Sequence, residues 1–125
     1  MKIETFEDLK DINAVLVYSS NNNVHNNVYT GGWLDYNCNV LLFYYGNYGL
    51  YHTSYIKSIE IKTLNSQTLL IAQTRNSVYK FEIDYSYNIE DVSIFRDEDE
   101  IKIIEDRCKI FDYTLEHVLD IELSK

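Results

Sequence analysis

The feature that most constrains the fold is an unbroken alternation of side chains over residues 78–85. The apolar and the charged residues of this run fall on opposite parities, Tyr79, Phe81, Ile83 and Tyr85 against Lys80, Glu82 and Asp84. Successive side chains of a β-strand point to opposite faces, and aromatic and β-branched residues favour strands. The run therefore predicts a strand with one buried and one exposed face.

Two further strand patterns precede this run and complete an antiparallel meander over residues 55–85. In the first, Ile59 and Ile61 share a parity with polar residues between them. Asn65 and Asn76, each followed by a serine, supply the turns, because Asn and Ser side chains hydrogen-bond to the nearby backbone.

The remaining patterns predict one α+β domain spanning residues 1–125. We expect an antiparallel sheet of five to seven strands, strongly curled or partly closed, with a short N-terminal helix and a C-terminal amphipathic acidic helix against one face. The segments before the meander are a capped helix over Thr5–Ile12, a buried strand over Ala14–Tyr18, a polar loop from Ser19 to Asn27, a strand over Val28–Tyr36 bent at Gly31-Gly32, a turn over Asp35–Asn39, a central strand over Val40–Tyr45 and a turn over Gly46–Gly49.

The last third of the chain contains apolar residues at steps of three and four, namely Ile101, Ile104, Cys108, Phe111, Leu115, Val118 and Leu119. This spacing predicts an amphipathic helix from about Asp99 to Ile121, roughly 35 Å long, with acidic side chains on another sector. In an alternative interpretation, residues 92–95 and 101–104 pair as a hairpin and a shorter helix begins at Asp106.

The net charge of −9 is unevenly distributed. Residues 1–81 contain six acidic and six basic residues, whereas residues 82–125 contain fourteen acidic and five basic ones. Such asymmetry concerns partners more than fold. A phosphate backbone binds a basic surface, so the sequence predicts no direct binding to nucleic acid.

The acidic residues of the last third are candidates for binding a basic protein, because carboxylates along a ridge can occupy a groove that normally binds phosphates. These candidates are Asp97, Glu98, Asp99, Glu100, Glu105, Asp106, Asp112 and Glu116. The alternative is a solvated helix face that keeps the protein soluble. A cation site at residues 97–100 is disfavoured, because four adjacent acids do not converge on one ion and the spacing of a calcium loop is missing.

Tyrosines crowd the segment from residue 34 to residue 59, where the only charged residues are Asp35 and Lys57. Tyrosine is common both in strands and in binding surfaces. A possible second interface consists of Tyr44, Tyr45, Tyr48 and Tyr51. Sheet edges without proline and with few lysines also favour pairing between copies, which makes a homodimer a further prediction.

Nothing in the sequence indicates an enzyme, a cofactor or a metal site. The histidines, His25, His52 and His117, show no ligand spacing with each other or with Cys38 and Cys108, and no glycine-rich phosphate loop is present. The two cysteines fit free thiols of a reducing cytosol, with a disulfide as the alternative. No apolar run is long enough to span a membrane and the first residues do not form a secretion signal, so we expect a cytoplasmic protein with no membrane contact.

One pattern in the meander resembles known proteins. Thr53-Ser54, followed by Thr74-x-Asn76-Ser77-x-Tyr79-x-Phe81, is similar to a pattern in small proteins of bacterial phages and mobile elements, among them anti-CRISPR inhibitors. Together with the uneven charge, this resemblance leads us to expect a small acidic binding protein that inhibits a basic nucleic-acid-handling partner, such as a CRISPR effector nuclease, by nucleic-acid mimicry in the host-cell cytoplasm. The alternative is a non-enzymatic phage accessory or assembly module that self-associates through a tyrosine-rich sheet.

Overall fold

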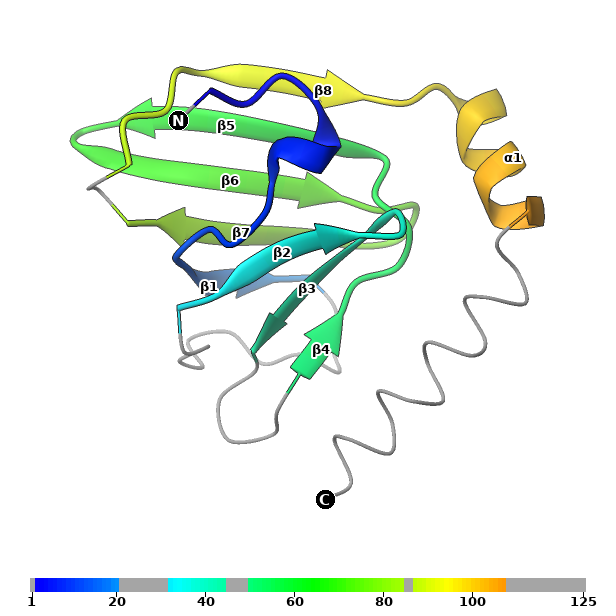
Figure 1. Cartoon of the computed structure of the whole chain (residues 1–125), viewed down its shortest axis with the longest axis horizontal. Helices are drawn as coiled ribbons and strands as arrows, with labels where there is room; N and C mark the ends of the chain where they lie inside the picture. Colours follow the sequence, from blue (N-terminus) through cyan, green and yellow to red (C-terminus); the bar gives the residue numbers. More distant parts are fainter. Residues whose placement is uncertain (1, 21–31, 45–49, 85–86, 108–125) are drawn as a thin grey trace.

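The computed structural model of the chain contains two antiparallel sheets, a 3-10 turn and a short α-helix (Figure 1). It describes residues 2–20, 32–44, 50–84 and 87–107. The larger sheet has the spatial order β1 (Ala14–Ser19), β7 (Val78–Ile83), β6 (Gln67–Gln73), β5 (Ser58–Leu64) and β8 (Val92–Phe95). The smaller sheet has the order β2 (Leu34–Asn37), β3 (Val40–Tyr44) and β4 (Leu50–His52).

The predicted meander is confirmed as β5, β6 and β7. Ile61, Leu70 and Phe81 lie opposite one another across the three strands and are fully buried, as the alternation requires. Asn65 and Ser66 form the two-residue turn between β5 and β6, with φ angles of 52° and 65°. Two consecutive positive φ angles match the twist of antiparallel strands, which fixes the register of this hairpin.

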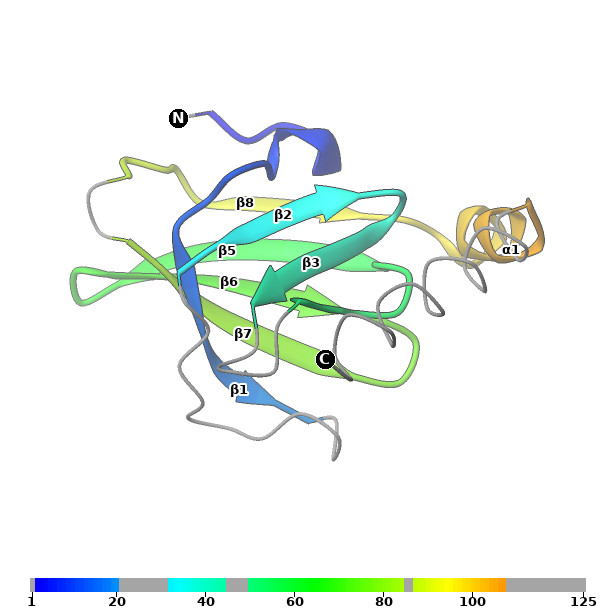
Figure 2. The same ribbon diagram turned by 60° about the horizontal axis from the view of Figure 1, so that its bottom comes forward.

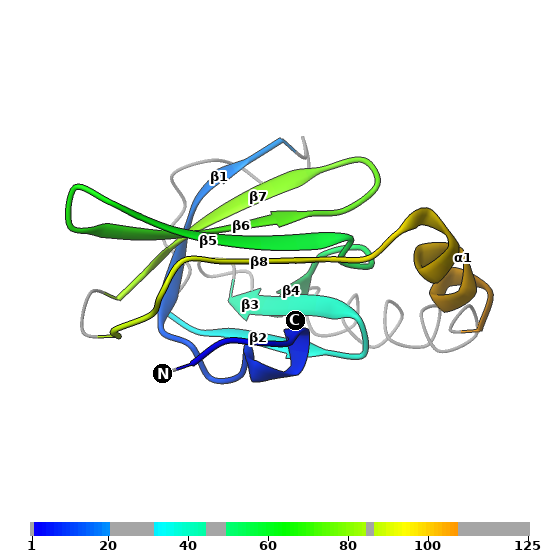
Figure 3. The ribbon, with the colours of Figure 1, turned by 90° about the horizontal axis from the view of Figure 1, so that it is seen from above.

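The two sheets form two layers with the hydrophobic core between them (Figure 3). The Phe43 ring of β3 joins the layers, since its centroid lies 5.2 Å from that of Phe81 and 6.4 Å from that of Tyr79, both on β7. Residues 40–43 are all buried. The predicted central strand is therefore confirmed in the middle of the smaller sheet, with both faces of residues 40–43 covered and Tyr44 exposed.

The N-terminal helix is shorter than predicted. Only Phe6–Asp8 is helical, as the 3-10 turn η1. The Asp8 carboxylate accepts the backbone N–H groups of Glu4 and Thr5 at 2.8 and 2.9 Å, and these bonds lower the pKa of Asp8. The backbone leaves the helical region at Leu9, with φ −85° and ψ 67°, and Asp11 then takes a left-handed φ of 53°. β1 follows as an edge strand in which Ala14 and Leu16 are buried but Tyr18 is exposed, so it is not buried on both faces.

Three expectations about the sheet are corrected. Among the described residues, eight strands form two separate sheets instead of one with five to seven strands, and neither sheet is closed. Residues 92–95 do form a strand, β8, but its partner is β5 and not residues 101–104, which are helical. The helix, α1 (Glu98–Arg107), lies beyond the strand ends and not on a sheet face (Figure 2), because the smaller sheet and η1 already cover the inner face of the larger one.

Several predicted segments lie outside the described residues. They are most of the polar loop that ends at Asn27, the first part of the strand with its bend at Gly31, the turn at Gly46–Gly49, and the predicted helix beyond Arg107.

Candidate functional site at helix α1

The acidic segment at the end of β8 begins a helix because its residues satisfy the free backbone groups there. Asp97 Oδ1 accepts the backbone N–H of Glu100 at 2.8 Å, and the Asp97 carbonyl accepts that of Ile101 at 3.1 Å. A carboxylate at this capping position and acids in the first turn are both favoured by the unpaired N–H groups and the helix dipole. The four adjacent acids of the sequence therefore specify where α1 starts.

One face of α1 is attached to the larger sheet by ion pairs and also carries one buried apolar residue. Ile101 is only 1% exposed. Glu98 pairs with Lys57 at 2.9 Å and with Arg75 at 3.0 Å, and Arg75 also pairs with Glu105 at 2.9 Å. Residues 98, 101 and 105 share a helix face because they are three, four and seven positions apart. Two of the predicted acidic residues are thus directed at the body of the molecule.

These ion pairs shift the pKa values of Glu98 and Arg75. The hydrogen bond from Lys57, together with the charge of Arg75, lowers the pKa of Glu98. The hydrogen bond to Glu105 raises the pKa of Arg75. The charge of both carboxylates is largely balanced by cations of the sheet.

The opposite face of α1 presents acids to solvent. Asp99 and Asp106 lie seven positions apart on one side of the exposed Ile103, and Glu100 lies on its other side. The exposed Lys102 and Arg107 lie between these acids on the helix surface. None of these three acids forms an ion pair with a residue that the structure describes. Of the eight predicted acids, Asp99, Glu100 and Asp106 are therefore free to contact a partner, while Asp112 and Glu116 lie outside the described residues.

The predicted tyrosine surface is only partly described. Tyr44 is 46% exposed, and its ring lies 5.4 Å from that of Trp33 on the outer face of the smaller sheet. Tyr51 packs instead on Phe43 at 5.6 Å, at the core. Tyr45 and Tyr48 are outside the described residues.

Arg96 holds α1 and β8 in place, a role that the sequence analysis did not identify. Its guanidinium donates to the Ile56 carbonyl and to the Tyr36 hydroxyl, each at 2.6 Å, and lies 4.1 Å above the Phe6 ring. Burial raises the pKa of Tyr36, against the effect of this hydrogen bond. No local pattern marks an arginine at the end of a short strand as such an anchor, because all its partners are distant in sequence.

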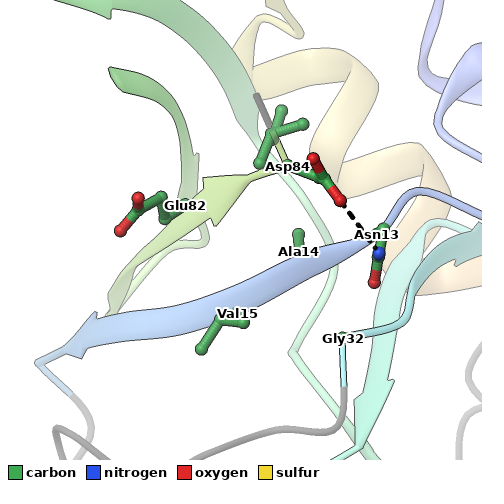
Figure 4. A pocket seen from close by; sticks show the side chains of 7 residues that line it. Asn13, Ala14, Val15, Gly32, Glu82 and Asp84 are labelled. Atoms are coloured by element: carbon green, nitrogen blue, oxygen red, sulfur yellow. Dashed lines mark hydrogen bonds between the residues drawn. The ribbon is translucent and has the colours of Figure 1, made fainter. Parts of the chain in front are cut away.

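A hollow of about 380 Å³ between β1 and the end of β7 contains two carboxylates (Figure 4). Asp84 accepts a hydrogen bond from the Asn13 amide at 3.2 Å, and the Glu82 side chain lies apart from both. Gly32 lines the hollow with a φ of 82°, and a Cβ there would lie 2.5 Å from Asn13 Oδ1. General acid–base catalysis needs groups directed at one reacting atom, which this arrangement does not provide.

The described cysteine and the other possible ligand side chains form no cluster in the described ranges. Cys38 is an exposed free thiol in the turn between β2 and β3, and Cys108 lies outside these ranges. No three His, Cys, Asp or Glu side chains among the described residues are grouped to hold a metal ion. No helix in the described part of the chain has the length and apolar character needed to cross a membrane.

No family model, no curated protein and no solved structure matches this chain. Its function therefore has to be inferred from its own charges and surfaces.

Proposed function

We propose that the protein is a small acidic binding protein that inhibits a basic, nucleic-acid-handling partner. The observation that carries this proposal is the group of exposed acids on α1 that form no ion pair with a described residue, Asp99, Glu100 and Asp106. This group belongs to the last third of the chain, which holds the whole net charge of −9. Carboxylates held on a helix present a fixed negative surface to a groove rich in lysine and arginine.

A CRISPR effector nuclease in the host cytoplasm is the first partner to test. Such an effector binds nucleic acid in positively charged channels, mainly through backbone contacts. An acidic surface that occupies such a channel competes with nucleic acid. Its binding weakens as salt concentration rises, because exposed charges are screened.

The direct test is nuclease binding and inhibition by the variant Asp99→Lys/Asp106→Lys. We expect this variant to bind at least about tenfold more weakly than the wild type at low salt, since two attractive contacts become repulsive. The matched control is Glu4→Lys/Glu7→Lys, which changes the net charge equally on exposed residues at the N-terminus. Equal loss in both variants, or binding that does not respond to salt, contradicts the proposal.

A second candidate function is a phage accessory module that self-associates through its tyrosine-rich sheet. The exposed Tyr44, in contact with Trp33, favours this alternative. Light scattering of the wild type and of Tyr44→Ser distinguishes the two functions. Self-association that Tyr44→Ser abolishes, together with activity that survives the charge reversal on α1, favours the module.

A further inference from the structure

β8 is an edge strand whose outer side is not paired with any described residue. In the larger sheet it lies at one end of the strand order, beside β5 (Figure 1). Val92 and Ile94 pack against the core, so Ser93 and Phe95 point to the opposite face. Phe95 is 75% exposed, which is unusual for an aromatic side chain on a short strand.

The backbone of β8 also offers hydrogen-bonding groups to solvent. The Arg96 N–H donates to the Lys57 carbonyl at 2.9 Å, which places residue 96 at a hydrogen-bonded position opposite β5. These positions alternate along an antiparallel pair. The N–H and C=O groups of Ile94 and Val92 therefore face β5, and those of Ser93 and Phe95 face away from it.

Apart from its length of four residues, this edge lacks the devices that usually prevent strands from pairing. β8 contains no proline and no lysine, and its register with β5 has no bulge. The nearest cation, Arg96, is turned inward to Tyr36 and Ile56. An extended segment of another chain can therefore add to β8 as a further strand.

The charges at the two ends of β8 identify the chemistry of that segment. At its start, Glu90 and Asp91 line a hollow of about 430 Å³, together with Lys2, Ile3, Asn88 and Val92. At its end are Asp97 and the exposed acids of α1. The Asp91 carboxylate accepts the Thr63 backbone N–H of β5 at 2.9 Å, and that of Asp97 caps α1. An added strand therefore meets Glu90 at one end and the exposed acids of α1 at the other.

A second copy of this chain is disfavoured at the same edge. In the antiparallel register with Ser93 opposite Phe95, Asp91 of each copy faces Asp97 of the other, and in the register with Ser93 opposite Ser93 the net charges of the two copies still repel. Like charges directly opposite destabilise a strand pair, and each copy carries a net charge of −9. The edge therefore selects a cationic segment over its own copy.

We infer that the outer edge of β8 binds an extended, basic segment of a partner protein by strand addition. Lysine or arginine side chains at the two ends of the segment meet the acids that flank β8, and an apolar side chain packs on Phe95. This inference rests on the proposed function in that both assign a basic protein partner. It adds that the partner contributes a strand as well as a charged groove.

The test uses the full chain and a fluorescein-labelled peptide, Lys-Arg-Val-Thr-Val-Thr-Val-Arg-Lys, with affinity measured by fluorescence anisotropy. A peptide with glutamate in place of the four basic residues tests the charge requirement. The key variant is Ser93→Pro, which removes an outward N–H and is compatible with an edge strand. We expect it to weaken binding about tenfold or more.

A second pair of variants tests the apolar contact. Phe95→Ser should weaken binding, whereas Leu64→Ser, at a side chain that is 60% exposed beside the β5–β6 turn, should leave it unchanged. Amide hydrogen exchange in the wild type is independent of any folding defect in the variants. Bound peptide should slow exchange at Ser93 and Phe95 and leave Ile94, already paired with β5, as it was.

Three outcomes overturn the inference: no binding of the basic peptide, equal binding by Ser93→Pro and the wild type, or unchanged exchange at Ser93 and Phe95 with peptide bound. A fourth outcome also overturns the inference: slower exchange of the Ser93 and Phe95 amides at higher protein concentration without peptide, which would show that a second copy pairs with this edge. The two proposals fail separately. If Asp99→Lys/Asp106→Lys loses nuclease binding and Ser93→Pro does not, the proposed function holds and strand addition at β8 fails. If the basic peptide binds at β8 but the protein neither binds nor inhibits the nuclease, strand addition holds and the proposed function fails.

Discussion

At the scale of single residues, Glu98 shows how the charge of α1 is joined to the sheet. Its carboxylate accepts from Lys57 at 2.9 Å, and this bond contributes most to its lowered pKa. A lowered pKa means that ionised Glu98 stabilises the fold above the unfolded-state value of about 4.3, and that this contribution is lost as pH falls through the lower folded value. We expect a carbon-13 NMR titration of the Glu98 carboxyl to show a midpoint below the usual range.

The same titration in variants assigns the cause. Lys57→Met should move the midpoint of Glu98 back toward the usual range. Lys62→Met, which removes a neighbouring lysine that pairs with Glu60 at 2.7 Å, should not. A Glu98 midpoint that is insensitive to Lys57→Met would show that the ion pair does not form in solution.

The sequence predicted which residues carry the charge but not which of them remain free. Lys57 and Arg75 approach Glu98 because β5, the β6–β7 turn and the end of β8 meet at one end of the sheet. This juxtaposition depends on strand order, which no local pattern specifies. The same reason explains why Arg96 was not recognised as an anchor.

At the scale of elements, the turn between β5 and β6 offers a test of what determines register. Ser66 has a φ of 65°, which a side chain with a Cβ disfavours. Glycine adopts this conformation without steric cost and is preferred after asparagine in such turns. We expect Ser66→Gly to stabilise the protein by about 0.5–1 kcal/mol in urea unfolding.

The control for this change is Ser54→Gly. Ser54 is exposed and has a negative φ, so glycine there adds only flexibility to the unfolded chain and should be slightly destabilising. Equal effects of the two substitutions would mean that strain in the turn does not limit stability.

Elements with a strong period were predictable, and elements defined by distant partners were not. Residues 78–83 alternate without a break, and β7 is where the pattern placed it. Residues 92–95 also read as a strand, but a strand exists only with a partner. Here the partner is β5, about thirty residues earlier, and not the adjacent segment 101–104. Asp97 caps a helix at this point and so excludes the hairpin.

At the scale of the whole molecule, the division into two sheets could not be read from the sequence. Strands of both sheets carry similar patterns of apolar residues, and a strand pattern does not state which sheet a strand joins. Packing decides it, because β3 is apolar on both sides and needs cover on both. Its inner face meets Tyr79 and Phe81 of β7, while Val40 and Leu42 pack with Trp33, Leu50 and Tyr55 on the outer face.

Because Phe43 contacts β7 of the larger sheet from within the smaller one, the two sheets should unfold together. Phe43→Ala leaves a cavity between the layers and should cost about 3–5 kcal/mol. Far-UV circular dichroism follows both sheets, whereas Trp33 fluorescence follows the smaller one. We expect the two signals to share one urea midpoint in the wild type and to shift together in Phe43→Ala. The control is Tyr44→Ala, at a partly exposed side chain of the same strand, which should cost less than about 1 kcal/mol. Separate midpoints in the wild type would show that the two sheets unfold independently and that the core between them is not one cooperative unit.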